Sequence, residues 1–170
     1  MDHQKIAFRV DASLDIASGH VMRCLTLADA LRKKGRECIF ICRAHTGNMI
    51  QLIVDCGFEV HELPKINRNL SVLHNADELK VEGLGYDYWL GCTWDVDAHQ
   101  TVSILSDIMP AWLVVDHYAL DSRWETLMLP LCDRILVLDD LANRKHDRSL
   151  LLDQNLGKSP ADYNHLVPTN

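Results

Sequence analysis

Apolar runs typical of β-strands alternate with helical patterns over the first 63 residues, and this alternation constrains the fold more than any other feature. The predicted elements are a strand at 5–10, a helix at 20–34, a strand at 37–43, a helix at 49–56 and a strand at 58–63. Strand–helix–strand repetition of this kind predicts right-handed β-α-β units, in which the strands run parallel.

The second half of the chain continues the same pattern. Residues 65–93 are harder to interpret and are expected to include a long loop. The later predictions are a helix at 95–109, a strand at 111–116, a helix at 122–131, a strand at 134–138 and a short strand at 150–152. The inner face of the helix at 95–109 is assigned to Val96, Val102, Leu105, Ile108 and Met109. Without repeats or linkers, residues 1–170 are predicted to form one Rossmann-like α/β domain of three layers around a parallel sheet.

Composition limits the partners and the compartment of this domain. Of 170 residues, 48% are apolar and 24% charged, and the net charge is -7, which argues against binding to nucleic acid or an anionic membrane surface. No stretch approaches the roughly 18 to 20 apolar residues of a membrane-spanning helix, and the first residues lack the pattern of a secretory signal. The six cysteines are scattered, and most lie in apolar segments, so they are expected to be buried and reduced. These features predict a cytoplasmic globular protein.

Ligands of open parallel sheets bind beyond the carboxyl ends of the strands, so the loops after residues 10, 115 and 138 are the places for a site. In the first loop, Ser18 and Gly19 allow a tight turn, and His20 begins a helix. The helix dipole there disfavours imidazolium, which would leave His20 neutral and able to accept a proton as a general base. The alternative, a histidine that only hydrogen-bonds the loop, is favoured by spacing alone. A dinucleotide site is not indicated, because the G-x-G-x-x-G pattern is missing.

The other two loops carry polar clusters of their own. Asp116, His117 and Tyr118 follow a buried strand and suit recognition of sugar hydroxyls or orientation of a base, although a loop cap and a packing tyrosine explain them equally well. Asp139 and Asp140 suggest a metal pair, but further oxygen ligands at fixed spacing are missing, and capping with solvated charges is preferred. The basic residues at 144–148 are also expected to be solvated. No metal site and no cofactor are predicted.

Five motifs then make a resemblance visible. In order along the chain they are FRVDASLDIASGHVMRCLTLADAL, WLG, WLVVDHYALD, LDDLANRKHD and LLLDQN. Together they closely resemble the N-terminal half of the PseG family, the UDP-2,4-diacetamido-2,4,6-trideoxy-β-L-altropyranose hydrolases of pseudaminic acid biosynthesis, which are related to GT-B glycosyltransferases such as the peptidoglycan enzyme MurG. The resemblance implies the N-terminal half of a GT-B fold, with the sugar and the base held here. It also implies a UDP-sugar substrate and a C-terminal UDP-binding domain that lies beyond residue 170.

The resemblance also implies roles for individual residues. The histidine of the Gly-His pair, His20, corresponds to the general base, and the tyrosine of the Asp-His-Tyr motif, Tyr118, corresponds to an active-site residue. The positions expected to bind or shape the substrate are Arg9, Asp11, Gly19, Asp116 and His117. One position departs from the family, which usually has glycine at the place of Ala17, so the loop is expected to be less free to take a positive φ.

The implied reaction is attack of water on the anomeric carbon with expulsion of UDP and inversion. No protein acid is required, because UDP is already a good leaving group, and no metal is needed, in agreement with the missing ligand spacing. Two alternatives stay open: half of a glycosyltransferase, since a fold alone does not distinguish water from a sugar acceptor, and a non-catalytic sugar-binding domain. Release of UDP without any acceptor would separate the first alternative from hydrolysis. The reading frame after codon 170 would show whether a UDP-binding domain follows.

Overall fold

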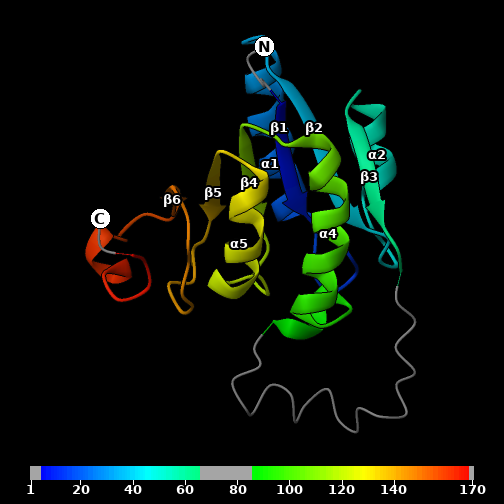
Figure 1. Cartoon of the computed structure of the whole chain (residues 1–170). Helices are drawn as coiled ribbons and strands as arrows, with labels where there is room; N and C mark the ends of the chain where they lie inside the picture. Colours follow the sequence, from blue (N-terminus) through cyan, green and yellow to red (C-terminus); the bar gives the residue numbers. More distant parts are fainter. Residues whose placement is uncertain (1–4, 66–85, 169–170) are drawn as a thin grey trace, which may run out of the picture.

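The computed structural model describes residues 5–65 and 86–168, which form one sheet of parallel strands with helices on both faces (Figure 1). The sheet has six strands in the order β3-β2-β1-β4-β5-β6. The strands are β1 (Lys5–Val10), β2 (Glu37–Arg43), β3 (Glu59–Leu63), β4 (Trp112–Asp116), β5 (Arg134–Leu138) and β6 (Leu150–Leu152). Every predicted strand is confirmed to within one residue, and so is the Rossmann-like three-layer arrangement.

Helices cover the two faces in pairs. The α-helices are α1 (Gly19–Arg32), α2 (Ile50–Asp55), α4 (Trp94–Ile108) and α5 (Ser122–Met128), and the 3-10 helices are η2 (Asp87–Leu90), η3 (Leu129–Leu131) and η4 (Pro160–Tyr163). In Figure 1, α4 and α5 lie in front of the sheet and α1 lies behind it. The predicted helices at 20–34, 49–56 and 95–109 are confirmed with small shifts of their ends. The one predicted at 122–131 is α-helical only to Met128 and continues as η3. Most of the predicted long loop, residues 66–85, lies outside the described residues.

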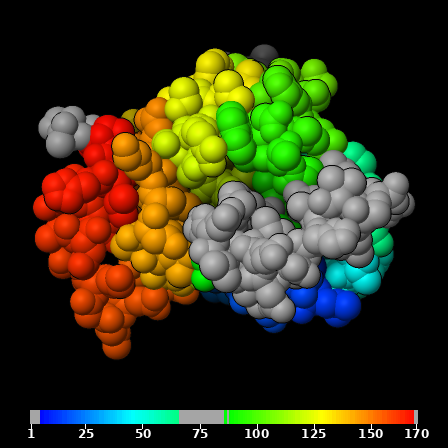
Figure 2. All heavy atoms as spheres, turned by 90° about the horizontal axis from the view of Figure 1, so that it is seen from below, coloured from blue at the N-terminus to red at the C-terminus, as the bar shows by residue number. Residues whose placement is uncertain are grey.

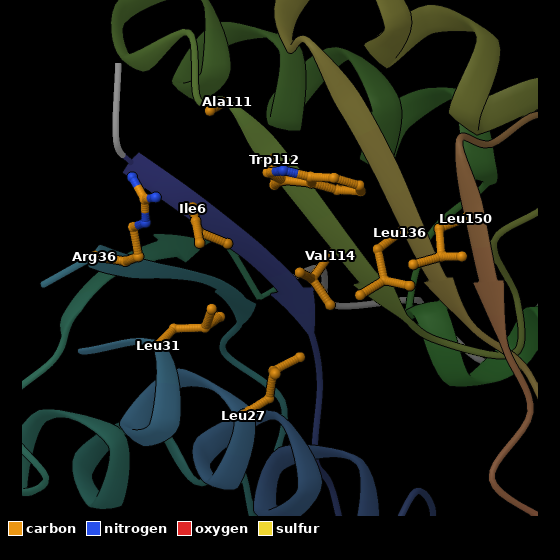
Figure 3. A pocket seen from close by; sticks show the side chains of 9 residues that line it. All are labelled: Ile6, Leu27, Leu31, Arg36, Ala111, Trp112, Val114, Leu136 and Leu150. Atoms are coloured by element: carbon orange, nitrogen blue, oxygen red, sulfur yellow. The ribbon is translucent and has the colours of Figure 1, made fainter. Parts of the chain in front are cut away.

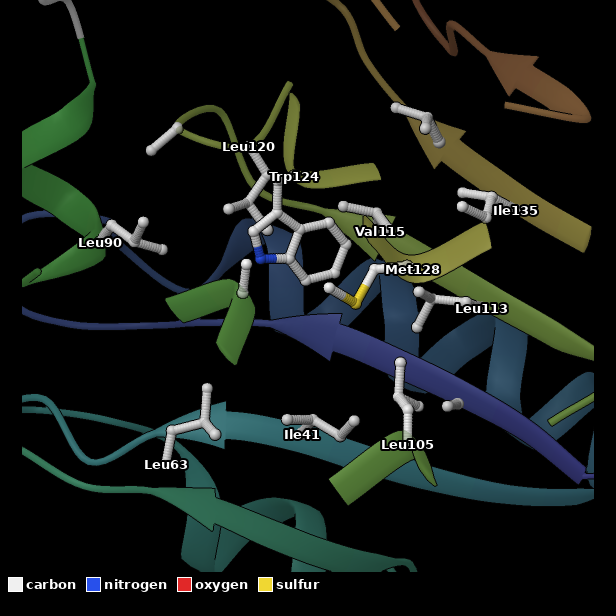
Figure 4. Close-up of a cluster of buried hydrophobic side chains, with 14 of the residues drawn as sticks. Ile41, Leu63, Leu90, Leu105, Leu113, Val115, Leu120, Trp124, Met128 and Ile135 are labelled. Atoms are coloured by element: carbon white, nitrogen blue, oxygen red, sulfur yellow. The ribbon is translucent and has the colours of Figure 1, made fainter. Parts of the chain in front are cut away.

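Alternate side chains of the strands point into two separate cores. On the α4 and α5 face, Leu113 and Val115 of β4 pack with Leu105, Trp124 and Met128 (Figure 4). On the α1 face, the set consists of Phe8, Val10, Phe40 and Val114 from the strands together with Val21, Cys24 and Ala28 from α1. Because the period of a strand is two, burial of both faces requires continuous apolar runs, and such runs are what identified β1, β2 and β4 in the sequence.

The inner face of α4 differs from the prediction. Val96 and Met109 are 37% and 43% exposed, so their assignment to the inner face was wrong, whereas Leu105 is buried as expected and Val102 and Ile108 pack partly against the core. The buried positions are Asp97, Ala98, Thr101 and Leu105. The buried carboxylate of Asp97 explains why a different face of α4 is buried, because it bonds the guanidinium groups of Arg9 on β1 and Arg43 on β2.

The cysteines are all free thiols, and four of the six are buried: Cys24, Cys38, Cys42 and Cys92. The prediction of buried, reduced thiols is confirmed for these four and wrong for Cys56, which is exposed. Burial raises the pKa of the Cys38 thiol to about 11, so it stays protonated at neutral pH. Among the described helices, none combines the length and the apolar character that crossing a bilayer requires.

The α1 face is less completely covered beside β4, β5 and β6. A cavity of about 340 Å³ opens there between α1 and the amino-terminal halves of the strands (Figure 3). Its lining is mostly apolar and consists of Ile6, Leu27, Leu31, Arg36, Ala111, Trp112, Val114, Leu136 and Leu150. Leu27 and Leu31 of α1 are therefore only partly buried. This cavity lies at the end of the sheet opposite to the loops that carry the polar motifs.

Candidate functional site

The strand order reverses between β1 and β4, with β2 and β3 on one side of the pair and β5 and β6 on the other. At such a switch point the loops that leave neighbouring strands diverge and open a crevice at their carboxyl ends. Figure 2 looks onto this end of the molecule, with α4 and α5 (green to yellow) along one border and the C-terminal residues (orange and red) along another. The loop that leads into α1 and the loop that follows β4 both begin here.

Three side chains from these loops meet at the switch point. His20 lies in the first turn of α1, and its Nδ1 is 2.6 Å from Oδ1 of Asp116, the last residue of β4. Arg23, one turn further along α1, donates from Nε to Oδ2 of Asp116 and from Nη2 to Oδ1, both at 2.5 Å. Asp116 is fully buried, and burial alone would raise its pKa, but the bonds from Arg23 and His20 outweigh burial and lower it. Asp116 is therefore a carboxylate at neutral pH.

This carboxylate decides which nitrogen of His20 carries the proton. An ionised carboxylate only accepts hydrogen bonds, so the 2.6 Å contact requires a proton on Nδ1. Nη2 of Arg23 also lies 3.0 Å from Nδ1, but it is itself a donor and is already bonded to Asp116. In the neutral ring, Nε2 is then left as the nitrogen that accepts a proton. A buried carboxylate that fixes the tautomer of a histidine in this way is the arrangement found behind histidine general bases.

Arg23 connects this pair to a second carboxylate and to an aromatic wall. Its Nη1 is 3.3 Å from Oδ2 of Asp140, and the hydroxyl of Tyr118 donates to Oδ1 of the same residue at 2.5 Å. Burial and this bond raise the pKa of Tyr118, so it remains a neutral phenol. The Tyr118 ring packs edge-on against His20 with ring centroids 4.6 Å apart, and Trp89 stacks on Tyr118 at 5.7 Å. We call His20, Arg23, Asp116, Asp140 and Tyr118 the site network.

A second set of charges lies beneath the site and has no exposure to solvent. Arg9 of β1 forks both oxygens of Asp11 at 2.7 and 2.8 Å and also bonds Asp97 at 2.6 Å. Arg43 of β2 donates to the same Oδ2 of Asp97 at 2.6 Å, and the indole of Trp124 donates to Oδ1 at 3.0 Å. Burial opposes ionisation of Asp11, but Arg9 holds its pKa well below the usual range. We call Arg9, Asp11, Arg43 and Asp97 the buried network.

His117 and His45 lie against the buried network. Nδ1 of His117 accepts from the backbone N–H of Ala119 at 3.1 Å, which leaves Nε2 as the protonated nitrogen, and burial lowers its pKa. That Nε2 is 3.4 Å from Oδ2 of Asp11, too long and misaligned for a good hydrogen bond. His45 approaches the same oxygen at 3.4 Å. A Cβ on Gly91 would lie 2.8 Å from the His45 ring, and Gly91 has a φ of 75°, so the glycine of the WLG motif is required here.

A scan against models of protein families found no match, and a search of curated proteins also found none. A search of solved structures gave a match to MurG of Acinetobacter baumannii, with a TM-score of 0.52 and 12% sequence identity. The match covers 81% of this chain and 35% of the MurG chain, so the protein spans about a third of the length of that neighbour. At this identity the likeness shows the fold alone. The chain has a Rossmann-like, GT-B-like fold.

The structure brings some of the predicted site residues together and places others below them. His20, Asp116 and Tyr118 meet in the site network, as expected from loops at one end of the sheet. Arg9 and Asp11 are fully buried in the buried network, and His117 is 2% exposed beside them. Their direct contact with a ligand stays a prediction, and their observed contacts are to each other and to Asp97.

The loop between Asp11 and His20 contains the position that departs from the PseG pattern. Ala17 has a φ of 62°, so the loop takes a positive φ at this position although alanine disfavours it. Its N–H bonds the carbonyl of Ser13 at 3.1 Å, and the Ser13 hydroxyl accepts from the N–H of Ile16 at 3.0 Å. These turn bonds hold the alanine in a left-handed conformation. At Gly19 a Cβ would meet no atom within 4 Å, so the space beside it is open.

The loop after β5 differs from its prediction in burial. Asp139 does cap a turn, accepting from the N–H of Ala142 at 3.0 Å, but it is 1% exposed rather than solvated. Arg144 donates to Asp139 at 2.6 Å, and His146 is buried with Nδ1 2.7 Å from Glu125 of α5. The expected solvated basic patch is therefore wrong at Arg144 and His146, whose side chains bond Asp139 and Glu125 inside the fold. Within residues 5–65 and 86–168, no group of three or more potential ligands could hold a metal ion.

Sequence reasoning missed three residues that the structure places at the centre of both networks: Arg23, Asp97 and Arg43. A charged residue on the apolar stripe of a helix, or within an apolar strand, was the available signal. Asp97 lies one turn from Thr101 on the buried face of α4, and Arg43 ends the otherwise apolar strand β2. Asp140 was considered as a metal ligand or, preferably, a loop cap, although it accepts bonds from both Tyr118 and Arg23.

Proposed function

We propose that this chain is the sugar-side domain of an enzyme that hydrolyses a UDP-linked diacetamido-trideoxy sugar, with His20 as the general base. The observation that carries the proposal is the 2.6 Å contact between His20 Nδ1 and buried Asp116 at the switch point of the sheet. It leaves Nε2 to take the proton of a water molecule. The ordered motifs that resemble the PseG family, and the GT-B-like fold, support the same conclusion.

In the proposed reaction, water attacks the anomeric carbon while the bond from that carbon to the phosphate oxygen of UDP breaks. The water proton passes to Nε2 of His20 and from there to solvent, and the products are the free sugar, inverted at the anomeric carbon, and UDP. Asp116 stabilises the positive charge that His20 acquires. Tyr118 holds its hydroxyl on Asp140, so its ring, with Trp89 stacked behind it, forms an apolar wall beside the base.

UDP is proposed to bind to a second domain. The chain spans 35% of the MurG chain, which leaves room for such a domain in a protein of that size. The site network lies on a face at the carboxyl ends of the strands, where a crevice with a second domain would form. The protein is proposed to act in the cytoplasm, where nucleotide sugars are made.

The test is release of UDP from the UDP-diacetamido sugar with no acceptor present. The protein is expressed with any reading frame that follows codon 170, or is mixed with a separate UDP-binding domain. We expect His20→Gln to lower the rate by about 10²- to 10⁴-fold, the usual contribution of a general base. Binding of the nucleotide sugar, measured by calorimetry, should change little, because the base acts in the transition state.

The matched control is His99→Gln, a histidine exposed on α4. Its rate should equal that of the unchanged protein. Inversion is checked by proton NMR of the freshly formed sugar, before mutarotation. If His20→Gln releases UDP as fast as the unchanged protein, His20 is not the base and the proposal fails.

A glycosyltransferase half is the second candidate, favoured by the structural match to MurG. The same Asp116–His20 pair would then deprotonate the hydroxyl of an acceptor sugar instead of water. The two candidates differ in one measurement, because a transferase releases UDP only after an acceptor is added. A third outcome, binding of the sugar without release of UDP under either condition, would indicate a sugar-binding domain without catalytic activity.

A further inference from the structure

We infer that Arg23 and Asp140 are positioning residues, which act through Asp116 and Tyr118 to hold His20 in its base form. The inference deepens the proposed function and rests on it for its catalytic part. None of the sequence motifs singled out either residue for this role. The argument starts from Arg23, because a single guanidinium bonds both carboxylates of the site network.

Arg23 holds Asp116 in the one orientation that serves His20. Two donors of the guanidinium bond the two oxygens of Asp116 at 2.5 Å each, which fixes the carboxylate plane. The thiol of Cys24 adds a weaker contact to Oδ2 at 3.5 Å. Oδ1, shared between Arg23 and His20, then points at Nδ1. Without the guanidinium, a buried Asp116 would be free to rotate or to take up a proton. After either change, the ring proton of His20 would no longer be confined to Nδ1.

Asp140 closes the network on the other side of the ring. It accepts the hydroxyl of Tyr118 at 2.5 Å and approaches Nη1 of Arg23 at 3.3 Å. Through the first bond it fixes the Tyr118 ring, which makes a T-shaped contact with the His20 ring, the two ring centroids lying 4.6 Å apart. His20 is thus held by the carboxylate of Asp116 and by the ring of Tyr118. Arg23 contacts both restraints, directly at Asp116 and through Asp140 at Tyr118. Arg144 is a second cation near this wall, with its guanidinium carbon 5.7 Å from the centre of the Tyr118 ring.

The decisive experiment is nitrogen NMR of the histidine rings in the 170-residue chain, which needs no substrate. In the unchanged chain we expect His20, identified by its loss in His20→Gln, to show a single neutral tautomer with the proton on Nδ1. Arg23→Gln should give a mixture of tautomers at His20. Arg23→Lys should restore the single tautomer only in part, because an ammonium does not make the two-pronged bond. Lys33→Gln, an exposed cation on the same helix, is the control and should change nothing.

A second variant protects the test from a folding defect at Arg23. Asp140→Asn keeps the size of the side chain, removes its charge and replaces one acceptor oxygen with an amide donor. The titration of Tyr118, followed by ultraviolet absorbance, should move to lower pH, because the charged acceptor on its hydroxyl is gone. In a UDP-releasing assembly, Arg23→Gln should lower kcat by about 10- to 100-fold with little change in KM, as for residues that orient a reacting group.

The outcomes separate the two proposals. A single His20 tautomer that survives in Arg23→Gln overturns the positioning role, whatever the activity. A loss of tautomer together with a protein that never releases UDP supports the positioning role and contradicts hydrolysis. A rise in KM with unchanged kcat would also overturn the inference, because it would mean that Arg23 binds the substrate.

Discussion

The buried network and the site network lie next to each other at the same end of the sheet, yet they balance charge differently. The buried network contains two guanidiniums and two carboxylates, all with fully buried side chains. In the site network one guanidinium, Arg23, faces two carboxylates, and its side chain is 18% exposed. The first network is neutral as it stands. The second reaches neutrality only when His20 takes up a second ring proton and becomes positively charged.

This difference suggests separate roles: the buried network stabilises the fold and acts as a structural support, whereas the site network takes part in the reaction. A closed, balanced set of buried ions is rigid, and removing one member leaves a charge with no counterion and no water. A set with one excess negative charge stabilises a positive charge that forms during a reaction. Asp11 belongs to the buried network and His20 to the site network, and the loop from β1 to α1, residues 11–18, links the two. The predictions below test whether stability and activity divide along this line, beginning with the largest expected effect.

Asp97→Asn should destabilise the fold more than any other single change in these networks. Its oxygens accept bonds from Arg9, Arg43 and Trp124, so two buried guanidiniums lose their shared counterion. We expect the free energy of unfolding to fall by about 3 to 5 kcal/mol, the cost of breaking a buried ion pair. Urea unfolding followed by circular dichroism measures it. Asp95→Asn, on the exposed side of the same helix, should lower the free energy of unfolding far less. Similar losses for the two variants would show that the buried network is not a support.

Asp116→Asn should act mainly on activity. The asparagine amide can donate to Nδ1 of His20, which would place the ring proton on Nε2 and remove the base. We expect the rate of UDP release to fall about 100-fold, equivalent to about 2.7 kcal/mol of transition-state stabilisation. The exposed Asp133→Asn is the control and should keep the full rate. A normal rate in Asp116→Asn would mean that the carboxylate does not set the tautomer.

The sequence predicted the elements of the fold more completely than it predicted these two networks. Strand β4 is readable because a continuous apolar run is buried on both faces whatever its neighbours are. His20 and Asp116 are readable as site residues because parallel strands deliver their loops to one end of the sheet. The pairing itself is not readable, since it joins residues 96 positions apart. Asp97 illustrates the limit, because its partner Arg9 lies 88 positions away and the local pattern around Asp97 favoured Val96 as the inner residue.

Acid should weaken the contribution of Asp116 to stability. Its pKa in the folded protein is lowered by the bonds from Arg23 and His20, which outweigh burial. A lowered pKa means that the stabilisation is present above about pH 4, the ordinary pKa of aspartate, and is lost as the pH falls through the folded value. At pH 7 we expect the free energy of unfolding of the unchanged protein to exceed that of Asp116→Asn by about 1.5 kcal/mol, the usual value of a charged hydrogen bond. Urea unfolding at a series of pH values should show this difference shrinking below pH 4, and a difference that grows instead would contradict the ion pairing.

Ala17→Gly should have the smallest effect, and its sign tests the loop that links the two networks. Alanine at a φ of 62° carries a left-handed strain of about 1 to 2 kcal/mol. Glycine removes that strain but adds about 0.4 to 1 kcal/mol of entropy to the unfolded chain, so a net gain of about 0.5 to 1 kcal/mol in the free energy of unfolding is expected. Ala30→Gly, at an exposed position inside α1, should have the opposite sign and cost about 1 kcal/mol. Because the turn bonds from Ser13 already set the loop, UDP release should stay within about twofold in Ala17→Gly. A larger change in rate would mean that the backbone conformation at Ala17 affects the position of His20, and that the loop couples the buried network to the site network.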